Sequence, residues 1–202
     1  MSDSTQDTTS VLFVCTGNIC RSPIAEAMLK ESAISGVHVS SAGLLFDNRL
    51  ASDGAIEWGE HAGMDLTAHR SRVINRSIVQ TADLVLGMEP RHVREVVALH
   101  DPAWAHTFTL VEFVGRCLRH GPRQHGEPIA GWLRRLSAER ARIDLLADDP
   151  DLTVFDPYGL GFEVYERTAA RIGELLAAVI ANCWPEFHAA QAGSDVTGIP
   201  RW

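Results

Sequence analysis

The feature that most constrains this chain is a strand, a short loop and a helix start within residues 11–27. The apolar, β-prone run Val11–Val14 leads into Cys15, and Arg21 follows after five intervening residues. Pro23 suits the first turn of a helix, where its missing N–H costs no hydrogen bond. The pattern predicts a parallel α/β sheet whose first strand ends at a ligand-binding turn, as is usual in open α/β sheets.

The loop after Cys15 has the length and composition of a phosphate-binding loop. Its backbone N–H groups are expected to point inward as an anion nest, and the dipole of the following helix adds positive charge at the same place. Such surroundings favour the thiolate form of Cys15. Arg21 offers a planar guanidinium that grips two phosphoryl oxygens at once, while Gly17 and Asn18 tolerate the dihedral angles of a tight loop. The expected phosphate-binding residues are Thr16, Gly17, Asn18, Ile19, Cys20, Arg21 and Ser22.

Residues 11–27 resemble the low-molecular-weight protein tyrosine phosphatase family almost position for position. The resemblance implies that Cys15 is the nucleophile and that Arg21 clamps the phosphate. It also implies that Asn18 and Ser22 hold the loop and tune the thiolate. The implied reaction is hydrolysis of phosphate monoesters, above all protein phosphotyrosine or a small aryl phosphate, through a phosphocysteine intermediate. No metal or other cofactor is expected, because the guanidinium and the backbone amides carry the charge.

A cysteinyl phosphatase also needs an acid that protonates the leaving oxygen and later activates water. Asp156 stands before the last predicted helix, and Pro157 biases it toward an extended conformation. In the resembled family an Asp-Pro pair near the C-terminus supplies the general acid, so the match assigns Asp156 that role. The match also places Tyr158 on the wall of the substrate cleft. Gly159 stands where many members carry a second aromatic residue, which predicts a more open rim.

Three further residues match supporting positions of that family. Ser41 is expected to hydrogen-bond to the nucleophile loop, the alternative being an ordinary strand-end serine. His69 matches a histidine that buttresses the loop, the alternative being a surface or core histidine. Cys20 matches a loop cysteine that can form a disulfide with the nucleophile and so protect Cys15 from irreversible oxidation; the alternative is a small apolar filler.

The alternation of strand and helix patterns indicates an α/β fold. The resemblance implies a four-stranded parallel sheet of flavodoxin-like winding. With 202 residues, 46% of them apolar, one domain is expected over 11–188, between a disordered N-terminal tail at 1–10 and a C-terminal tail at 189–202. Strands are expected at 11–15, 37–41, 83–87 and 106–110, and helices at 22–34, 52–62, 90–99, 127–146 and 162–182.

The segment 112–150 does not fit the shorter pattern of the family and is expected to be a helical insertion. Apolar residues recur in it at helical spacing, and seven arginines make it locally basic. One interpretation is an extra amphipathic helix packed on the domain. The other is a basic cap beside the active site that recruits acidic phosphoproteins or a partner.

Charge and composition limit the possible partners and the compartment. The net charge of −8 argues against nucleic-acid binding, and no stretch is apolar enough to span a membrane. Residues 1–10 are polar and do not form a signal peptide, and the four cysteines follow no zinc-binding pattern. We expect a cytoplasmic monomer with free thiols. The single lysine, Lys30, against many arginines favours a GC-rich bacterial source.

Two alternative functions stay open, one of them another enzyme and the other a protein without catalytic activity. An arsenate reductase on the same fold needs further cysteines when it is coupled to thioredoxin, and Cys117 and Cys183 are far apart in the sequence. Versions coupled to low-molecular-weight thiols need fewer cysteines, although their loop sequence usually differs. A non-catalytic phospho-binding regulator usually loses the nucleophile or the acid, whereas this chain keeps Cys15, Arg21 and Asp156.

Overall fold

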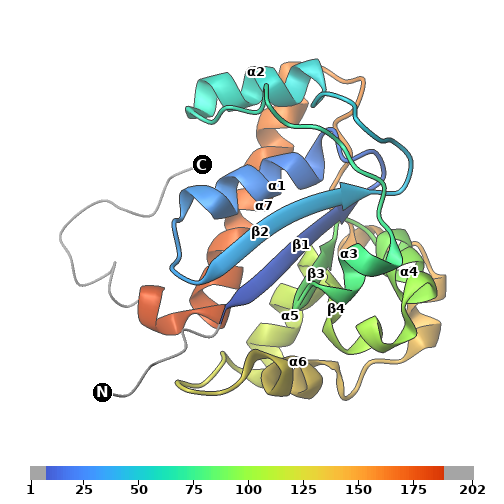
Figure 1. Ribbon diagram of the computed structural model, residues 1–202, viewed down its shortest axis with the longest axis vertical. Coiled ribbons are helices and arrows are strands. Elements are labelled where there is room, and N and C mark those ends of the chain that lie inside the picture. The colour runs from blue at the N-terminus through green and yellow to red at the C-terminus, as the bar shows by residue number, and fades with distance from the viewer. Residues whose placement is uncertain (1–7, 189–202) are drawn as a thin grey trace.

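The computed structural model describes residues 8–188, and its centre is a parallel four-stranded sheet with the strand order β2-β1-β3-β4 (Figure 1). The sheet and its parallel pairing confirm the predicted α/β fold. Because β1 lies between two strands, the loop after it leaves from the interior of the sheet. The strands are β1 (Thr9–Cys15), β2 (Val37–Gly43), β3 (Leu84–Gly87) and β4 (Thr107–Thr109).

Helices cover both faces of this sheet. Successive side chains of a strand point to opposite faces, so Val11 and Phe13 of β1 join one buried cluster while Leu12 and Val14 join the other. The helices are α1 (Arg21–Glu31), α2 (Asp53–Ala62), α3 (Arg76–Gln80), α4 (Pro90–Leu99), α5 (Leu110–His120), α6 (Ile129–Ser137) and α7 (Phe162–Cys183). Three 3-10 helices lie at Asp101–His106, Arg142–Leu146 and Pro150–Leu152.

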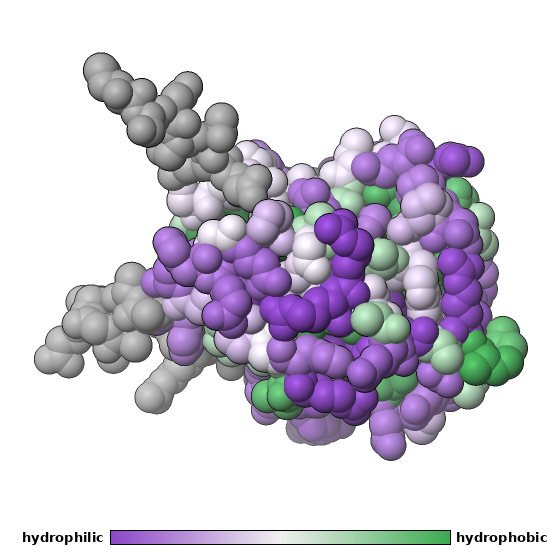
Figure 2. Space-filling view, turned by 90° about the horizontal axis from the view of Figure 1, so that it is seen from below, coloured by the Kyte–Doolittle hydropathy of each residue, from purple (hydrophilic) through white to green (hydrophobic). Residues whose placement is uncertain are grey.

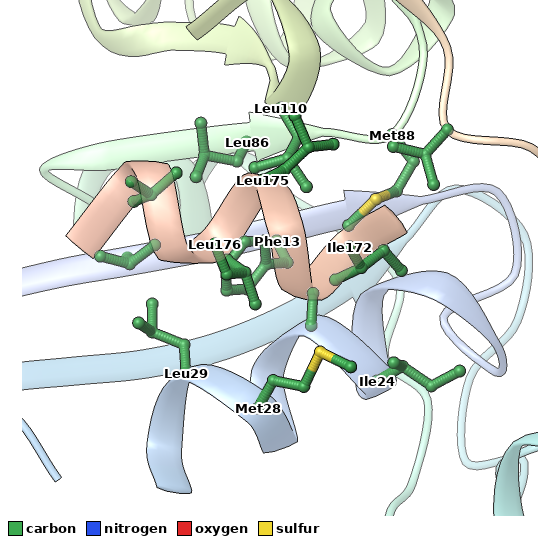
Figure 3. Close-up of a cluster of buried hydrophobic side chains, with 14 of the residues drawn as sticks. Phe13, Ile24, Met28, Leu29, Leu86, Met88, Leu110, Ile172, Leu175 and Leu176 are labelled. Atoms are coloured by element: carbon green, nitrogen blue, oxygen red, sulfur yellow. The ribbon is translucent and has the colours of Figure 1, made fainter. Parts of the chain in front are cut away.

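The larger cluster fixes the helix that follows the nucleophile loop (Figure 3). Phe13 of β1 packs among side chains of α1 and α7, including Met28 and Leu176. Burying one such side chain contributes about 2 kcal/mol. Since α1 is anchored in this way, its first turn and the loop before it are held at a fixed place against the strand.

The structure differs from the predicted elements mainly after β4. No helix was expected at α3, and α5 had no predicted bounds of its own, although most of it lies in the predicted helical insertion. The helix predicted over 127–146 ends at Ser137. Ile143, which continues the apolar helical spacing of that predicted helix, is exposed. Arg116 conceals the amphipathic pattern of α5, because this arginine is buried and donates to the carbonyl of Leu136.

The predicted tails fall largely outside the described residues. The C-terminal tail at 189–202 and residues 1–7 lie beyond them. Thr9 and Ser10, which were placed in the N-terminal tail, belong to β1. Among residues 8–188, no helix is long and apolar enough to cross a membrane.

The α6 segment does not lie beside the cleft that follows β1. It packs on α5 and on the 3-10 helix that precedes β4, and it lies at the bottom of Figure 1, away from the arrowheads of β1 and β2. Figure 2 views this end of the molecule and shows a largely hydrophilic face with scattered apolar residues. Most arginines of the segment make contacts within the protein, namely Arg116 with Leu136, Arg123 with Glu186, Arg135 with Glu127, Arg140 with Glu112 and Arg142 with Asp101. The interpretation as a packed helix fits these contacts, and no arginine of residues 112–150 lines the cleft. Recruitment of a partner by this segment stays a prediction.

Candidate active site

Cys15 is the last residue of β1, and its sulfur is enclosed by donors from the loop that follows. The N–H of Asn18 and the hydroxyl of Ser22 donate to Cys15 Sγ at 3.1 Å and 3.0 Å. The cysteine itself is buried. Two donors aimed at one sulfur stabilise a negative charge on it, since hydrogen bonds to charged groups are stronger than neutral ones.

Asn18 gives the loop its shape. It adopts the left-handed conformation with a φ of 52°, which asparagine tolerates better than most residues. Gly17, which was expected to help in this way, does not have a positive φ. Gly43 at the end of β2 is required instead, because a Cβ there would lie 2.7 Å from the backbone nitrogen of Asn18.

The side chain of Asn18 links the loop to two residues that the sequence pointed out. Its Nδ2 donates to Ser22 Oγ at 3.0 Å and to Ser41 Oγ at 2.7 Å. Its Oδ1 accepts from the N–H of Arg72 at 3.0 Å, and its backbone carbonyl contacts His69 Nε2 at 2.8 Å. The structure therefore brings both Ser41 and His69 against the nucleophile loop.

Glu26 completes this network from the second turn of α1. The hydroxyl of Ser41 donates to one carboxylate oxygen of Glu26, and Lys30 pairs with the other. A carboxylate only accepts hydrogen bonds. The hydroxyl hydrogen of Ser41 is therefore committed to Glu26, so that Ser41 can only accept from Asn18.

Arg21 is the first residue of α1, and its guanidinium lies almost fully buried at the base of the cleft. Nη1 donates to Glu89 Oε2 at 3.0 Å and to the carbonyl of Val154 at 3.1 Å. Nη2 donates to Asp156 Oδ2 at 2.5 Å and to Thr16 Oγ1 at 3.4 Å. Among the described residues Nε has no hydrogen-bond partner, although a buried donor normally has one.

A buried histidine stands behind the loop. His92 Nε2 lies 3.1 Å from Thr16 Oγ1. Burial, and then the charge of Arg21, lowers the pKa of His92 to about 2, so the ring is neutral at ordinary pH. Its 3.7 Å approach to Glu89 Oε1 is therefore not an ion pair.

Asp156 and Tyr158 lie across the cleft from the loop. Asp156 Oδ1 accepts from the N–H of Tyr158 at 3.2 Å, which closes a short turn. Gly159 has a φ of 76°, so the residue that replaces an aromatic in many members of the resembled family has a conformational reason to be glycine. Tyr158 is mostly exposed.

The cleft between these two segments has a volume of about 190 Å³. It contains every residue predicted for phosphate binding except Asn18 and Ser22, which lie behind its wall. Among residues 8–188, no group of three or more His, Cys, Asp or Glu side chains is arranged to hold a metal ion. The cleft is lined by Cys15, Thr16, Gly17, Ile19, Cys20, Arg21, Leu45, Phe46, Asp156 and Tyr158.

Cys20 sits in the same loop and faces two hydroxyl groups. Its sulfur lies 3.1 Å from Ser52 Oγ and 3.4 Å from the hydroxyl of Tyr165, and these two hydroxyls are 3.0 Å apart. Burial raises the pKa of the Cys20 thiol, although both hydrogen bonds oppose the rise. The four cysteines are free thiols in this structure, and a protective disulfide between Cys15 and Cys20 stays a prediction.

Several residues that line the cleft or contact the nucleophile loop from behind carry no clear signal in the sequence. Glu89 is an exception, because it directly follows the buried run Leu84–Met88 at the carboxyl end of a strand, where functional residues gather. The others, apart from Glu26 on α1, come from segments far from the loop in sequence. They are Glu26, Leu45, Phe46, Ser52, His92 and Tyr165.

The sequence profile described as "Low molecular weight phosphotyrosine protein phosphatase" matches residues 10–123. A "Probable low molecular weight protein-tyrosine-phosphatase EpsP" from Ralstonia nicotianae is 38% identical over 104 residues, which are 51% of this chain and 71% of that protein. A "Protein-arginine-phosphatase" from Geobacillus stearothermophilus is 35% identical over 144 residues, covering 68% of this chain and 90% of the relative.

A solved structure gives the same result for the fold. The low molecular weight protein tyrosine phosphatase from T. tengcongensis superposes with a TM-score of 0.64 at 31% identity, over 86% of this chain and 98% of that one. Neither the arsenate reductase nor the non-catalytic alternative is favoured by these similarities.

Proposed function

Because this chain belongs to the low molecular weight phosphotyrosine protein phosphatase family, we propose that it hydrolyses phosphotyrosine in proteins at the cleft around Cys15. The chain is an enzyme, a phosphatase that works through a phosphocysteine intermediate. We assign Cys15 as the nucleophile, Arg21 as the phosphate clamp and Asp156 as the general acid and base. The observation that carries these assignments is that all three side chains line one cleft of about 190 Å³.

In the first step the thiolate of Cys15 attacks phosphorus and the bond to the leaving oxygen breaks. Three phosphoryl oxygens then share negative charge, which fixed donors stabilise. The unpartnered Nε of Arg21 is one such donor, since a phosphoryl oxygen would satisfy it. Asp156 gives its proton to the leaving tyrosine oxygen.

The contact between Arg21 and Asp156 has a role in this step. A phosphoryl group bound by Arg21 Nη2 replaces the Asp156 carboxylate as its partner. Once its contact with Arg21 is replaced, the side chain of Asp156 is free to turn toward the leaving oxygen. Substrate binding thus prepares the acid for proton transfer.

In the second step water attacks the phosphocysteine, and Asp156 now accepts the proton from that water. Cys15 leaves as a thiolate, and the donors of Asn18 and Ser22 receive the charge on its sulfur. These donors make the sulfur a better leaving group. Inorganic phosphate is the product.

The walls of the cleft favour an aryl phosphate. Ile19, Leu45 and Phe46 on one side and Tyr158 on the other present apolar or aromatic surface around the path to Cys15. A tyrosine ring buries apolar area there, whereas a charged guanidinium loses hydration on these walls and meets a carboxylate only at Asp156 among the residues that line the cleft.

Phosphoarginine is the second candidate substrate. The relative from Geobacillus stearothermophilus is named a protein-arginine-phosphatase, and its similarity extends over more of this chain than that of EpsP. Asp156 is the cleft residue that a guanidinium leaving group would approach. Two peptides that differ only in carrying phosphotyrosine or phosphoarginine decide between the candidates. The preferred substrate is the one with the larger kcat/KM.

The test begins with p-nitrophenyl phosphate in EDTA and reductant, comparing wild type with Cys15→Ser and Asp156→Ala. We expect metal-independent activity that disappears with Cys15→Ser and falls sharply with Asp156→Ala. Peptides with one phosphotyrosine or one phosphoarginine follow. Full activity of Cys15→Ser would overturn the assignment of the nucleophile.

We further propose that the enzyme works as a monomer in a bacterial cytoplasm. A nucleophilic thiol needs a reducing compartment, and the cysteines are unpaired. Cys20 is proposed to protect Cys15 by a reversible disulfide. A Cys20→Ser variant that regains activity after peroxide treatment as fully as wild type would contradict that role.

A further inference from the structure

A second hollow lies against the segment that carries Asp156. It has a volume of about 300 Å³ and none of its residues lines the catalytic cleft. Its walls come from the segment that leads into Asp156 and from the first three turns of α7. The lining residues are Val154, Phe155, Val164, Arg167, Thr168 and Arg171.

The segment between the two cavities is tied to the active site. The N–H of Val154 donates to the carbonyl of Met88 at 2.8 Å, and its own carbonyl accepts from Arg21. The next two residues diverge, because Phe155 lines the second hollow while Asp156 lines the catalytic cleft. A single backbone segment therefore separates the two cavities.

The ring of Phe155 is 62% exposed, so the packing of the domain does not account for it. Large exposed apolar side chains are ordinary when scattered, but this one forms a wall of a hollow together with Val154 and Val164. The hollow offers apolar surface to a side chain that comes from another molecule.

Two guanidinium groups stand at the same hollow. Arg167 and Arg171 are one turn apart on α7, and both are exposed. Arg171 pairs with Glu174 at 2.9 Å, but exposed ion pairs of this kind are weak and exchange readily. No ion pair of Arg167 occurs among the described residues.

We propose that this hollow is a second substrate subsite that holds a further phosphotyrosine of the same substrate protein. The proposal rests on the proposed function, since it extends the phosphotyrosine site by a neighbouring one. Apolar walls beside a guanidinium are the combination that the catalytic cleft also offers, and without a cysteine the second phosphotyrosine is bound and not hydrolysed. A ligand with a carboxylate but no ring would not contact the apolar surface of Phe155. A phenylalanine side chain would have no negative charge for Arg167 and Arg171.

The two cavities set the spacing of the two phosphotyrosines. They lie on either side of one backbone segment, Val154–Asp156, so their centres are on the order of 10 Å apart, about the spacing of two layers packed face to face. An extended peptide covers that distance in about three residues, at roughly 3.3 Å per residue. The substrate segment is therefore an extended stretch with two phosphotyrosines about two to four residues apart.

The experiment measures kcat/KM on peptides with one fixed phosphotyrosine and a variable residue three positions away. That position carries a phosphonate analogue of phosphotyrosine, tyrosine or phosphoserine. The phosphonate cannot be hydrolysed, so only the fixed phosphotyrosine reacts. We expect a gain of about fivefold for the phosphonate over tyrosine and over phosphoserine, the size of a weak exposed charge contact combined with ring burial.

The double variant Arg167→Ala/Arg171→Ala should remove this gain, and Phe155→Ala should reduce it. Both should keep wild-type activity on p-nitrophenyl phosphate, which also shows that they fold. Arg134→Ala, an exposed arginine on the distant α6, is the matched control and should keep the gain.

Equal rates for the phosphonate and tyrosine peptides, or for the phosphonate and phosphoserine peptides, would overturn the proposal. So would a gain that survives the double variant. If no phosphotyrosine peptide is hydrolysed at all, the proposed function fails first. If the singly phosphorylated peptide is hydrolysed and the second group brings no gain, the subsite alone fails.

Discussion

The nucleophile loop (Cys15–Ser22) and the acid segment (Asp156–Gly161) face each other across one cleft but are built in opposite ways. Six of the eight loop residues are buried, and the side chain and backbone of Asn18 tie the loop to two neighbouring segments, β2 and the connection that carries His69 and Arg72. All residues of the acid segment except Pro157 are exposed, and few hydrogen bonds hold it.

The difference separates two tasks. Charge stabilisation works best with dipoles that are already in place and need no reorganisation, and the buried loop supplies them. Proton transfer and substrate recognition need groups that approach the substrate after it binds, and such groups are common on exposed segments held by a rigid scaffold. The following variants test each half, in order of expected effect.

Asp156→Asn should reduce kcat/KM, which reports the transfer of phosphate to Cys15, on a phosphotyrosine peptide by about 10²–10⁴-fold, since general acid catalysis typically contributes that much. Asparagine keeps an oxygen for Arg21 but has no proton to give. On p-nitrophenyl phosphate, whose leaving group needs little protonation, the loss should be smaller. Asp151→Asn, in the preceding exposed turn, should leave both rates unchanged. An equal loss on the two substrates would argue against the acid role.

Gly43→Ala should damage the buried half without touching a reacting group. The new Cβ would lie 2.7 Å from the backbone of Asn18, so we expect the free energy of unfolding to fall by about 2 kcal/mol together with a large loss of kcat. Gly115→Ala is the matched control, because its Cβ would meet nothing within 4 Å. Urea unfolding and kinetics of both variants provide the measurement, and a fully active Gly43→Ala enzyme would contradict the tight approach of β2 to the loop.

Ser22→Ala removes one of the two donors to Cys15 Sγ. A hydrogen bond to a charged group contributes about 1.5 kcal/mol or more, so kcat should fall roughly tenfold. Ser32→Ala removes a buried serine at the other end of α1 that donates only to a backbone carbonyl. If both variants lost activity equally, the sulfur contact would have no special role.

His92→Gln tests the support behind the loop through its pH dependence. The unfolded chain protonates this histidine below pH 6.5, whereas the folded protein does so only near pH 2. Acid therefore favours unfolding, and stability that is present above pH 6.5 is lost as the pH falls. Between pH 7.5 and 5.5 the wild type should lose about 1.4 kcal/mol more than the variant. Urea unfolding at the two pH values measures this, and an identical pH change in both proteins would show that His92 is not buried as a neutral ring.

Glu26→Gln should have the smallest effect. Its amide can donate to Ser41, which allows the hydroxyl of Ser41 to turn toward Asn18 and compete with the existing bond. We expect kcat to fall about threefold, the cost of one weakened hydrogen bond. Glu60→Gln on the exposed face of α2 is the control. An unchanged Glu26→Gln enzyme would show that the orientation of the network does not depend on the carboxylate.

The sequence predicted the buried half better than its surroundings. A cysteine at a strand end, a left-handed asparagine and a helix start lie within eight residues, so local patterns identify them. Glu26 lies near them on α1 but reads as an ordinary surface glutamate, because its role depends on Ser41 of β2. His92 and Tyr165 reach the loop only through the folding of distant helices.

The elements after β4 show the same limit. Arg116 hides the buried face of α5 because a cation is rarely buried, and its contact with Leu136 exists only once α6 has packed. Ile143 led to the opposite error, a helix predicted too long, because it continues the helical spacing of apolar residues but is exposed. Both cases depend on tertiary contacts that no local pattern records.

The separation of the two halves has an evolutionary consequence. Leu45, Phe46 and Tyr158 line the cleft, yet none of their side chains joins the hydrogen-bond network around Cys15 among the described residues. Mutations at these positions can alter which phosphorylated residue enters while the chemical step is inherited unchanged. A lineage with this architecture can therefore change substrates by small steps, each of which passes through a working enzyme.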